Sequence, residues 1–310
     1  QARTLYRIGR LEALAALGEE GTDAAELTAD PAADLAADKT AITEEVLPTL
    51  EAGSLLWVAA QNALGAAELA ALERGDDDAL GRATLAFERA VSGLSVDSAP
   101  AEWAVAANNL GAVSLARAMR GDRAALTDAS ALLDACNRED LREDDPVLWA
   151  VTQCNLALAR TVAGVSGDAA AGARAPEYAR AALGILKRPT EPTLWALAQQ
   201  RLGLALLGLG SHGDTDALAE ATVAFDAAQT VMTREDAPNQ WAGLQVYHAL
   251  VAGEVFDWHG GTDPLEAMKN RLDTAAQVFE AEDDQDRLWE IEQHRKSLAE
   301  RLTAVADRVA

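Results

Sequence analysis

Two short segments of the sequence combine histidine with aspartate at spacings that could bind a metal ion. The segments are His212, Asp214 and Asp216, and Asp257, His259 and Asp263. Imidazole nitrogens and carboxylate oxygens are ordinary zinc ligands. The aspartates have a competing role, because an aspartate at the start of a helix caps it, and Gly-Asp pairs also occur in segments without histidine. We therefore predict no metal site.

Motifs of the common catalytic centres are missing from the sequence. It holds no Ser-His-Asp spacing, no glycine-rich phosphate loop and no Cys-x-x-Cys pair. The remaining histidines, His248 and His294, are isolated. We therefore predict that the protein is not an enzyme and needs no cofactor.

The two cysteines, Cys136 and Cys154, lie at equal distances from residue 145. If a turn between antiparallel helices lies there, the two thiols are at similar heights. We expect two reduced, packed thiols, with a disulfide between them as the alternative. Two cysteines in a chain of 310 residues exclude a disulfide-rich scaffold.

The charge balance excludes further classes of protein. Asp and Glu number 50 against 26 Lys and Arg, which gives a net charge of −24. Such a surface repels phosphate backbones, so we predict no nucleic-acid partner. No run of apolar residues is long enough to span a membrane. The acidic surface either attracts basic partners or serves solubility and adaptation to a salty setting.

The tryptophans reveal the elements that position all these residues. Trp57, Trp103, Trp149, Trp195 and Trp241 are each separated by 46 residues, and Trp289 follows 48 residues later. A fixed period of this length indicates a repeat architecture.

Other residues keep the same period and define one helical unit. Proline stands three residues before four of the tryptophans, at Pro100, Pro146, Pro192 and Pro238. Proline is favoured in the first turn of a helix, and Asp145 before Pro146 is a suitable N-cap. Gly-Asp pairs recur at Gly75-Asp76, Gly121-Asp122, Gly167-Asp168 and Gly213-Asp214. We expect the glycine to end one helix and the aspartate to cap the next.

A small–large–small pattern follows each Gly-Asp pair with helical spacing. Its members are Ala83-Phe87-Ala90, Ala129-Leu133-Cys136, Ala175-Ala179-Ala182 and Ala221-Phe225-Ala228. Small residues let helices approach closely, and the large residue fills the space between them. No segment alternates with a period of two, so we predict an all-α protein.

The first helix carries Leu-Gly in three units, at Leu64-Gly65, Leu110-Gly111 and Leu202-Gly203, and Leu156-Ala157 in the third repeat. This pair and the Ala-x-x-x-Phe-x-x-Ala of the second helix resemble the tetratricopeptide repeat, in a unit longer than the usual one of about 34 residues. The pattern Pro-x-x-Trp-Ala-x-x-Gln-x-x-Leu-Gly is similar to a bacterial long-repeat subgroup. The resemblance implies a right-handed α-solenoid of stacked antiparallel helix pairs.

The predicted organisation is one solenoid over residues 1–310. It comprises a degenerate N-terminal helix pair (1–53, with helices near 2–17 and 32–47), clear repeats at 57–102, 103–148, 149–194 and 195–240, a degenerate repeat at 241–286 and a capping helix at 286–308. Pro176 predicts a late start for the second helix of the third repeat, near Ala175. In the fifth repeat, His248 and Arg271 replace apolar residues of the pattern.

The resemblance also implies a binding surface, because first helices line the inner wall of such a stack. The partner-binding residues expected on this wall, counted from each Leu-Gly, are Asn62, Leu69, Val105, Asn108, Asn109, Ala112, Val151, Asn155, Leu158, Leu197, Gln200, Arg201 and Leu204, with Ala66, Leu115 and Cys154 beside them. The amides could hold an extended peptide backbone. Alternatively, Asn62, Asn108 and Asn155 satisfy backbone groups or neighbouring helices.

Our leading hypothesis is a non-catalytic scaffold or adaptor that binds a peptide or protein segment on this wall. One alternative is a small-molecule or lipid sensor that uses Val105, Val151, Leu197 and Leu204 as an apolar trough. Another is the sensing domain of a larger protein. We expect the repeated tryptophans to pack in seams between repeats, with a role in a ligand cage as the alternative.

The compartment follows only loosely from the sequence. Arginine outnumbers lysine and alanine is abundant, a bias that fits a GC-rich bacterial genome. We expect a cytoplasmic protein, with a periplasmic or exported protein after signal removal as the alternative.

Overall fold

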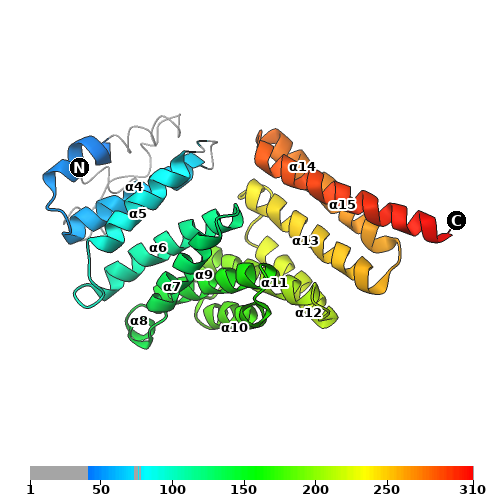
Figure 1. The fold of residues 1–310 in the computed structure, drawn as a ribbon, viewed down its shortest axis with the longest axis horizontal. Coiled ribbons are helices and arrows are strands. Elements are labelled where there is room, and N and C mark those ends of the chain that lie inside the picture. Colours follow the sequence, from blue (N-terminus) through cyan, green and yellow to red (C-terminus); the bar gives the residue numbers. More distant parts are fainter. Residues whose placement is uncertain (1–40, 73–75, 77, 310) are drawn as a thin grey trace. The chain divides into compact units, whose positions relative to one another are not determined.

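The protein is all-α, as the sequence predicts. The computed structural model describes residues 41–72, 76 and 78–309, and no strand occurs among them (Figure 1). The helices are α4 (Leu55–Leu72), α5 (Ala79–Ser92), α6 (Pro100–Met119), α7 (Arg123–Cys136), α8 (Glu139–Asp144), α9 (Pro146–Val165), α10 (Ala169–Ile185), α11 (Pro192–Gly210), α12 (Thr215–Gln229), α13 (Pro238–His259), α14 (Asp263–Ala281) and α15 (Gln285–Val309). Two short turns, η2 (Ala41–Val46) and η3 (Leu47–Thr49), precede them.

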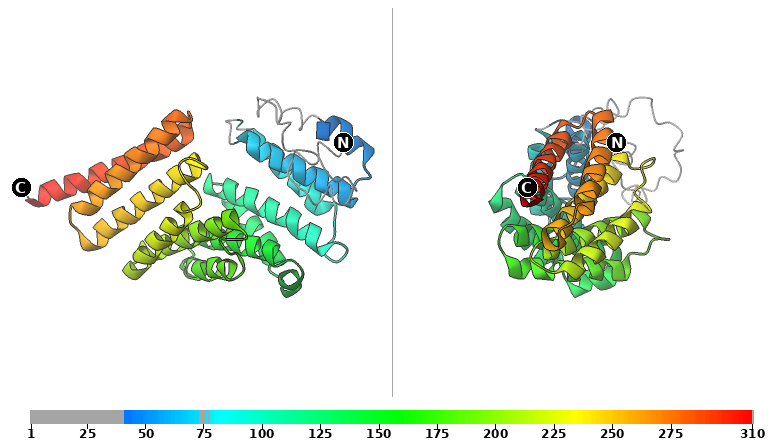
Figure 2. Two further views of the ribbon diagram at one scale, coloured as in Figure 1. Left: turned by 180° about the vertical axis from the view of Figure 1, so that it is seen from behind. Right: turned by 90° about the vertical axis from the view of Figure 1, so that its right-hand side faces the viewer.

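Consecutive helices pack as hairpins, one for each predicted repeat. α4 packs on α5, α6 on α7, α11 on α12 and α13 on α14, while α15 covers α14. Within a unit each hairpin also packs on the next, as α5 does on α6 and α12 on α13. Figure 2 shows this side-by-side arrangement for α13, α14 and α15 in both views. The fold is therefore built from stacked helix pairs, as in a solenoid.

The chain divides into two compact units, 1–152 and 153–310. The division falls inside α9, so the third hairpin begins in one unit and continues in the other. In the second unit α9 approaches α10 closely, because a Cβ atom on Gly164 would lie 2.7 Å from the Cα of Gly172.

The predicted Gly-Asp turns are confirmed in three repeats. Gly121, Gly167 and Gly213 adopt φ angles of 101°, 111° and 105°, which favour glycine. The following aspartates cap the next helices, each accepting a hydrogen bond from the backbone N–H three residues on. The prolines of the period begin α6, α9, α11 and α13, also as predicted.

Two local expectations are wrong. In the first repeat Asp76 does not cap the second helix: α5 begins at Ala79 after Asp78, and Asp76 pairs with Arg82 Nη2 at 2.5 Å. In the third repeat α10 begins at Ala169, not near Ala175, and contains Pro176. The cap at Asp168 fixes the start of α10, and the proline removes only one backbone donor from the helix.

The core is the predicted interlock of small and large residues. The ring of Phe87 lies so close to Gly65 that an added Cβ would be 2.5 Å from it, and Phe225 approaches Gly203 in the same way, at 2.4 Å. Both phenylalanines are almost fully buried. Leu-Gly therefore recurs because the glycine leaves room for the large residue of the partner helix.

Helices are predicted near both ends of the chain. The terminal helix expected at 286–308 is α15, and the prediction is confirmed. The helix expected near 2–17 lies outside the described residues. Of the helix expected near 32–47, the structure describes 41–47, where Ala41–Val46 forms a π-helical turn. No described helix combines the length and apolarity needed to cross a membrane.

Candidate functional site

The predicted wall residues of the first unit lie on α4, α6 and the start of α9. Asn109 on α6 donates a hydrogen bond from Nδ2 to Oδ1 of Asn62 on α4, at 3.3 Å. Both side chains are half-buried, as are Leu69, Val105 and Ala112. Equivalent faces of neighbouring first helices therefore meet, which is the arrangement that the repeat pattern requires.

Asn108 takes part in packing between helices. The side chain is only 3% exposed. Its Nδ2 donates to the carbonyl oxygen of Ala104 at 3.1 Å and to Oγ1 of Thr152 at 2.8 Å. Such an amide has little surface left for a partner, and its geometry matches the alternative reading, in which it satisfies a neighbouring helix.

The wall residues of the second unit lie on α9 and α11. Half-buried side chains from these two helices make up the face: Asn155, Leu158, Leu197, Gln200, Arg201 and Leu204. Val151 is also half-buried but belongs to the first unit. The face of the second unit thus combines aliphatic side chains, amides and one cation.

Arg201 is the most unusual residue of this face. Burial lowers the pKa of its guanidinium, and Tyr247 on α13 and Cys154 on α9 lie close enough to raise it in part. Arg201 is therefore surrounded by the first helices of three successive hairpins. Its Nε is buried without a hydrogen-bond partner, and no carboxylate of the described chain pairs with the guanidinium.

The two cysteines are free thiols buried in the packing. Burial raises the pKa of Cys136 and of Cys154 to about 12 in each case. Near neutral pH both are therefore protonated and poor nucleophiles. This agrees with the expected packed thiols.

In the fifth hairpin the replacement Arg271 is hydrogen-bonded, whereas the buried Nε2 of His248 has no hydrogen-bond partner among the described residues. His248 is 6% exposed, packs edge-on against Phe225 and places Nε2 3.3 Å from Oδ1 of Asp226. Burial and the nearby Arg271 lower the pKa of His248, so the ring is neutral at pH 7. Arg271 donates from Nη1 to Oε1 of Gln245 at 2.6 Å.

The histidine–aspartate segments do not assemble into a metal centre. Across the described residues, His, Cys, Asp and Glu form no group of three or more that could hold a metal ion. His212 Nδ1 contacts the carbonyl oxygen of Gly208 at 2.7 Å, and Asp214 caps α12. Asp257 pairs with Arg301. These three side chains therefore contact other residues of the chain and do not converge on one metal position.

A set of arginines over the tryptophans was missed in the sequence. The Cζ atoms of Arg142, Arg188 and Arg234 lie 5.0, 5.9 and 5.5 Å from the ring centroids of Trp149, Trp195 and Trp241. Each arginine precedes its tryptophan by seven residues, so the three arginines keep the 46-residue period. This period could have revealed the three arginines in the sequence. Each pair is a cation–π contact at the turn that enters a first helix.

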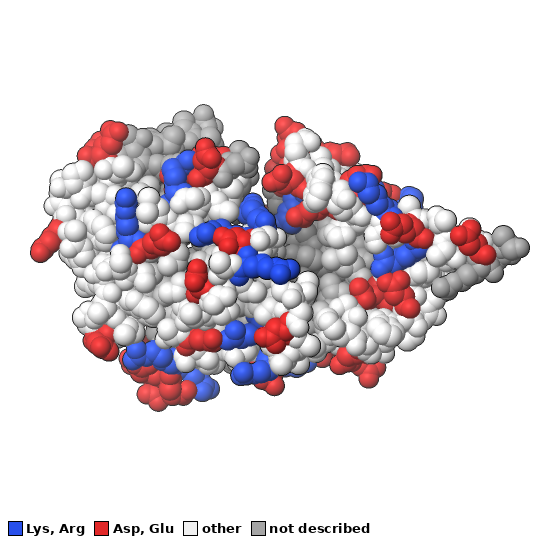
Figure 3. Space-filling model, viewed as in Figure 1, with Lys and Arg blue, Asp and Glu red and all other residues white. Residues whose placement is uncertain are grey.

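The surface charges are mixed. On the face shown in Figure 3, acidic and basic side chains are interspersed and form no continuous patch of one sign.

The chain was also compared with known proteins: no protein-family model, no curated protein and no solved structure matches it.

Proposed function

We propose that the protein is a non-catalytic scaffold that binds a peptide or protein segment along its first helices. Arg201 carries the proposal: a desolvated cation on the face of α11, without an anionic partner in the described chain. The segment brings a carboxylate to this guanidinium and lays its backbone against the amides nearby.

The contrast with other arginines supports a binding role for Arg201. Arg82, Arg117 and Arg180 each pair with one or more carboxylates of the chain itself. An arginine taken out of water without such a partner costs stability. A carboxylate from outside removes that cost and gains charge-assisted hydrogen bonds, which are stronger than neutral ones.

The surroundings of Arg201 fit a peptide. Leu197 and Leu204 lie one helical turn before and after it on α11 and are half-buried. Gln200 stands beside it with an amide that can both donate and accept. A peptide needs this combination: apolar contacts for burial, an amide for its backbone and a cation for one carboxylate.

The test is selection from a random peptide library displayed on phage. With the wild-type protein, we expect enriched peptides to share an Asp, a Glu or a free C-terminus at one position. Arg201→Met should abolish the enrichment of that carboxylate. The matched control is Arg180→Met, which removes an exposed arginine of α10 and should leave the selected motif unchanged. Identical motifs from wild type and Arg201→Met would refute the proposal.

The amides are tested separately on the first unit. Asn62→Ala combined with Asn109→Ala removes the pair that joins α4 to α6. We expect peptides selected on the first unit to bind more weakly to this variant, while the carboxylate preference set by Arg201 in the second unit remains. Equal affinity of both proteins would exclude the first unit from the binding surface.

A further inference from the structure

Trp57 and Trp103 are the exceptions among the tryptophans that begin a first helix, and Leu50 stands seven residues before Trp57. Trp149, Trp195 and Trp241 are each covered by the arginine seven residues before them. For Trp103 the corresponding position is Val96. No cation lies over the Trp103 ring in the part of the chain that the structure describes. The second repeat therefore keeps the indole but lacks its arginine.

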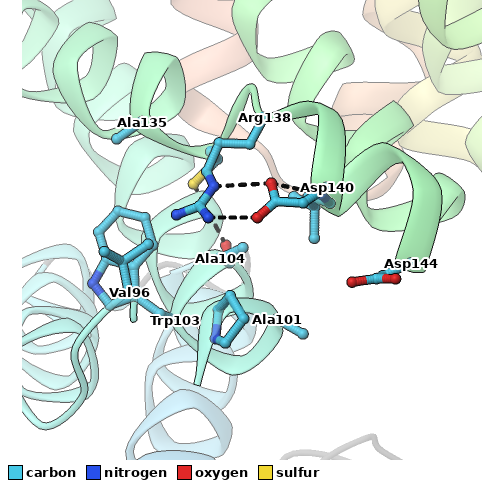
Figure 4. Close-up of a pocket in the computed structure, with 11 residues that line it drawn as sticks. Val96, Ala101, Trp103, Ala104, Ala135, Arg138, Asp140 and Asp144 are labelled. Carbon is cyan, nitrogen blue, oxygen red and sulfur yellow. Dashed lines mark hydrogen bonds and ion pairs between the residues drawn. The ribbon is translucent and has the colours of Figure 1, made fainter. Parts of the chain in front are cut away.

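A small, open pocket lies at this position. Figure 4 shows Val96 and Trp103 on one side of it and Asp140 and Asp144 on the other. The short helix α8, which contributes Asp140 and Asp144, replaces the plain turn found at the equivalent places of the other repeats. Valine thus leaves room beside the indole, and α8 places two carboxylates on the opposite side of the pocket.

The one cation that lines the pocket is already paired. Arg138 donates from Nε to Oδ1 of Asp140 at 2.9 Å, and its Nη2 pairs with Oδ2 of the same carboxylate. Asp97 is also close enough to help raise the pKa of Arg138. Asp140 and Asp144 line the pocket and Asp97 lies near Arg138, so three carboxylates accompany one guanidinium. The pocket is therefore negative and suits a cation.

We propose that this pocket binds an arginine side chain from a basic segment of a partner protein. The guanidinium lies over the Trp103 ring, where the chain's own arginines lie over the next three indoles. Asp144 supplies the opposite charge, and Trp103 and Val96 contact the aliphatic part of the side chain. The flat guanidinium suits this place, because it stacks on aromatic faces and is weakly hydrated.

The inference is independent of the proposed function. The pocket lies at the turn before α6, takes a cation and belongs to the first unit, whereas Arg201 lies in the second unit and takes an anion. Failure of one site leaves the other unaffected.

The experiment follows the indole N–H signals of the full chain by NMR. The Trp103 signal is identified by its loss in Trp103→Phe. The probe is the peptide acetyl-Gly-Arg-Gly-amide, and the matched control is the same peptide with neutral citrulline in place of arginine. We expect the arginine peptide in millimolar excess to shift the Trp103 signal and the citrulline peptide to leave it in place. An equal shift with both peptides, or none with either, would overturn the proposal.

Two variants test whether the missing arginine defines the site. Val96→Arg restores the cation of the other repeats and should weaken binding of the peptide at least about threefold, with the helical content unchanged. Arg142→Ala should create the same vacancy at Trp149 and make the Trp149 signal respond to the arginine peptide. A Val96→Arg protein that binds like wild type, or a Trp149 signal that stays silent in Arg142→Ala, contradicts the equivalence on which the inference rests.

Discussion

Asn108 on α6 donates a hydrogen bond to Oγ1 of Thr152 on α9 at 2.8 Å, in an environment where the asparagine is 3% exposed. Oγ1 of Thr152 in turn donates a hydrogen bond to the carbonyl oxygen of Leu148 at 3.1 Å. A short chain of hydrogen bonds therefore joins the first helices of two successive hairpins.

This chain of hydrogen bonds predicts a stability effect. Asn108→Ala removes a buried, fully engaged amide and leaves a cavity, so we expect it to lower the free energy of unfolding by about 1–3 kcal/mol. The measurement is urea denaturation followed by circular dichroism. Asn109→Ala, on the half-buried neighbour, is the control and should cost clearly less. Equal losses of unfolding free energy in the two variants would show that the buried hydrogen bonds of Asn108 add no stability.

Arg201 predicts an effect of the opposite sign. Arg201→Met removes a desolvated charge that has no ion-pair partner among the described residues. It keeps most of the aliphatic volume, so we expect it to stabilise the folded protein by about 1 kcal/mol. Thermal unfolding in the absence of peptide measures this. Arg180→Met, where the ion pair with Glu220 is exposed, should change stability little. A destabilised Arg201→Met protein would show that the guanidinium contributes to the fold.

How much of this could be predicted depends on whether a feature repeats. The Gly-Asp turns and the contacts of Gly65 with Phe87 keep the 46-residue period, so the columns of the sequence were enough to place them. The arginines over the tryptophans keep the same period and could have been found by the same reasoning. The start of α10 differs from the expectation because the cap at Asp168 stabilises the first turn and outweighs the cost of Pro176 inside the helix.

The candidate site was less predictable, because spacing gives the face of a helix but not its neighbours. Asn108 and Asn109 are adjacent in sequence and were assigned the same role. One is nevertheless buried against Thr152, and the other reaches Asn62 at a half-buried surface. Likewise, Arg201 has no anion beside it among the described residues because of how three helices pack together, which no single segment of sequence contains.

The thiols predict a clear chemical difference between folded and unfolded protein. Cys136 and Cys154 are buried with their pKa values raised to about 12, so little thiolate exists at pH 8. We expect both to react with a disulfide reagent such as Ellman's at least about a hundredfold more slowly in the folded protein than in urea. Two thiols titrated in urea without reductant would also exclude a disulfide. Rapid reaction of the folded protein would contradict the burial.

His248 predicts a pH dependence of stability. Its pKa in the folded protein is lowered, first by burial and then by Arg271, with Asp226 acting in the opposite direction. Its full contribution to stability is therefore present above the unfolded pKa of about 6.5 and is lost as the pH falls through the lower, folded value. Since protonation then favours unfolding, the melting temperature should fall between pH 7 and pH 5. His248→Leu restores the apolar residue of the repeat, so its melting temperature should fall less over the same interval. Parallel melting-temperature curves for the two proteins would assign the acid sensitivity to other groups, such as His294.

The contact between Gly203 and Phe225 predicts the cost of a single methyl group. A Cβ on Gly203 would lie 2.4 Å from Cε1 of Phe225, inside a fully buried cluster that has no room to relax. We therefore expect Gly203→Ala to destabilise the second unit by about 1–3 kcal/mol, although alanine is the better helix former. Gly243→Ala is the matched control: it lies in a first helix with no atom within 4 Å of the added Cβ and should be neutral or stabilising. If Phe225→Leu is combined with Gly203→Ala, only part of the loss should be recovered, because a Cβ on Gly111 would still lie 2.9 Å from Leu133, the leucine at the equivalent place.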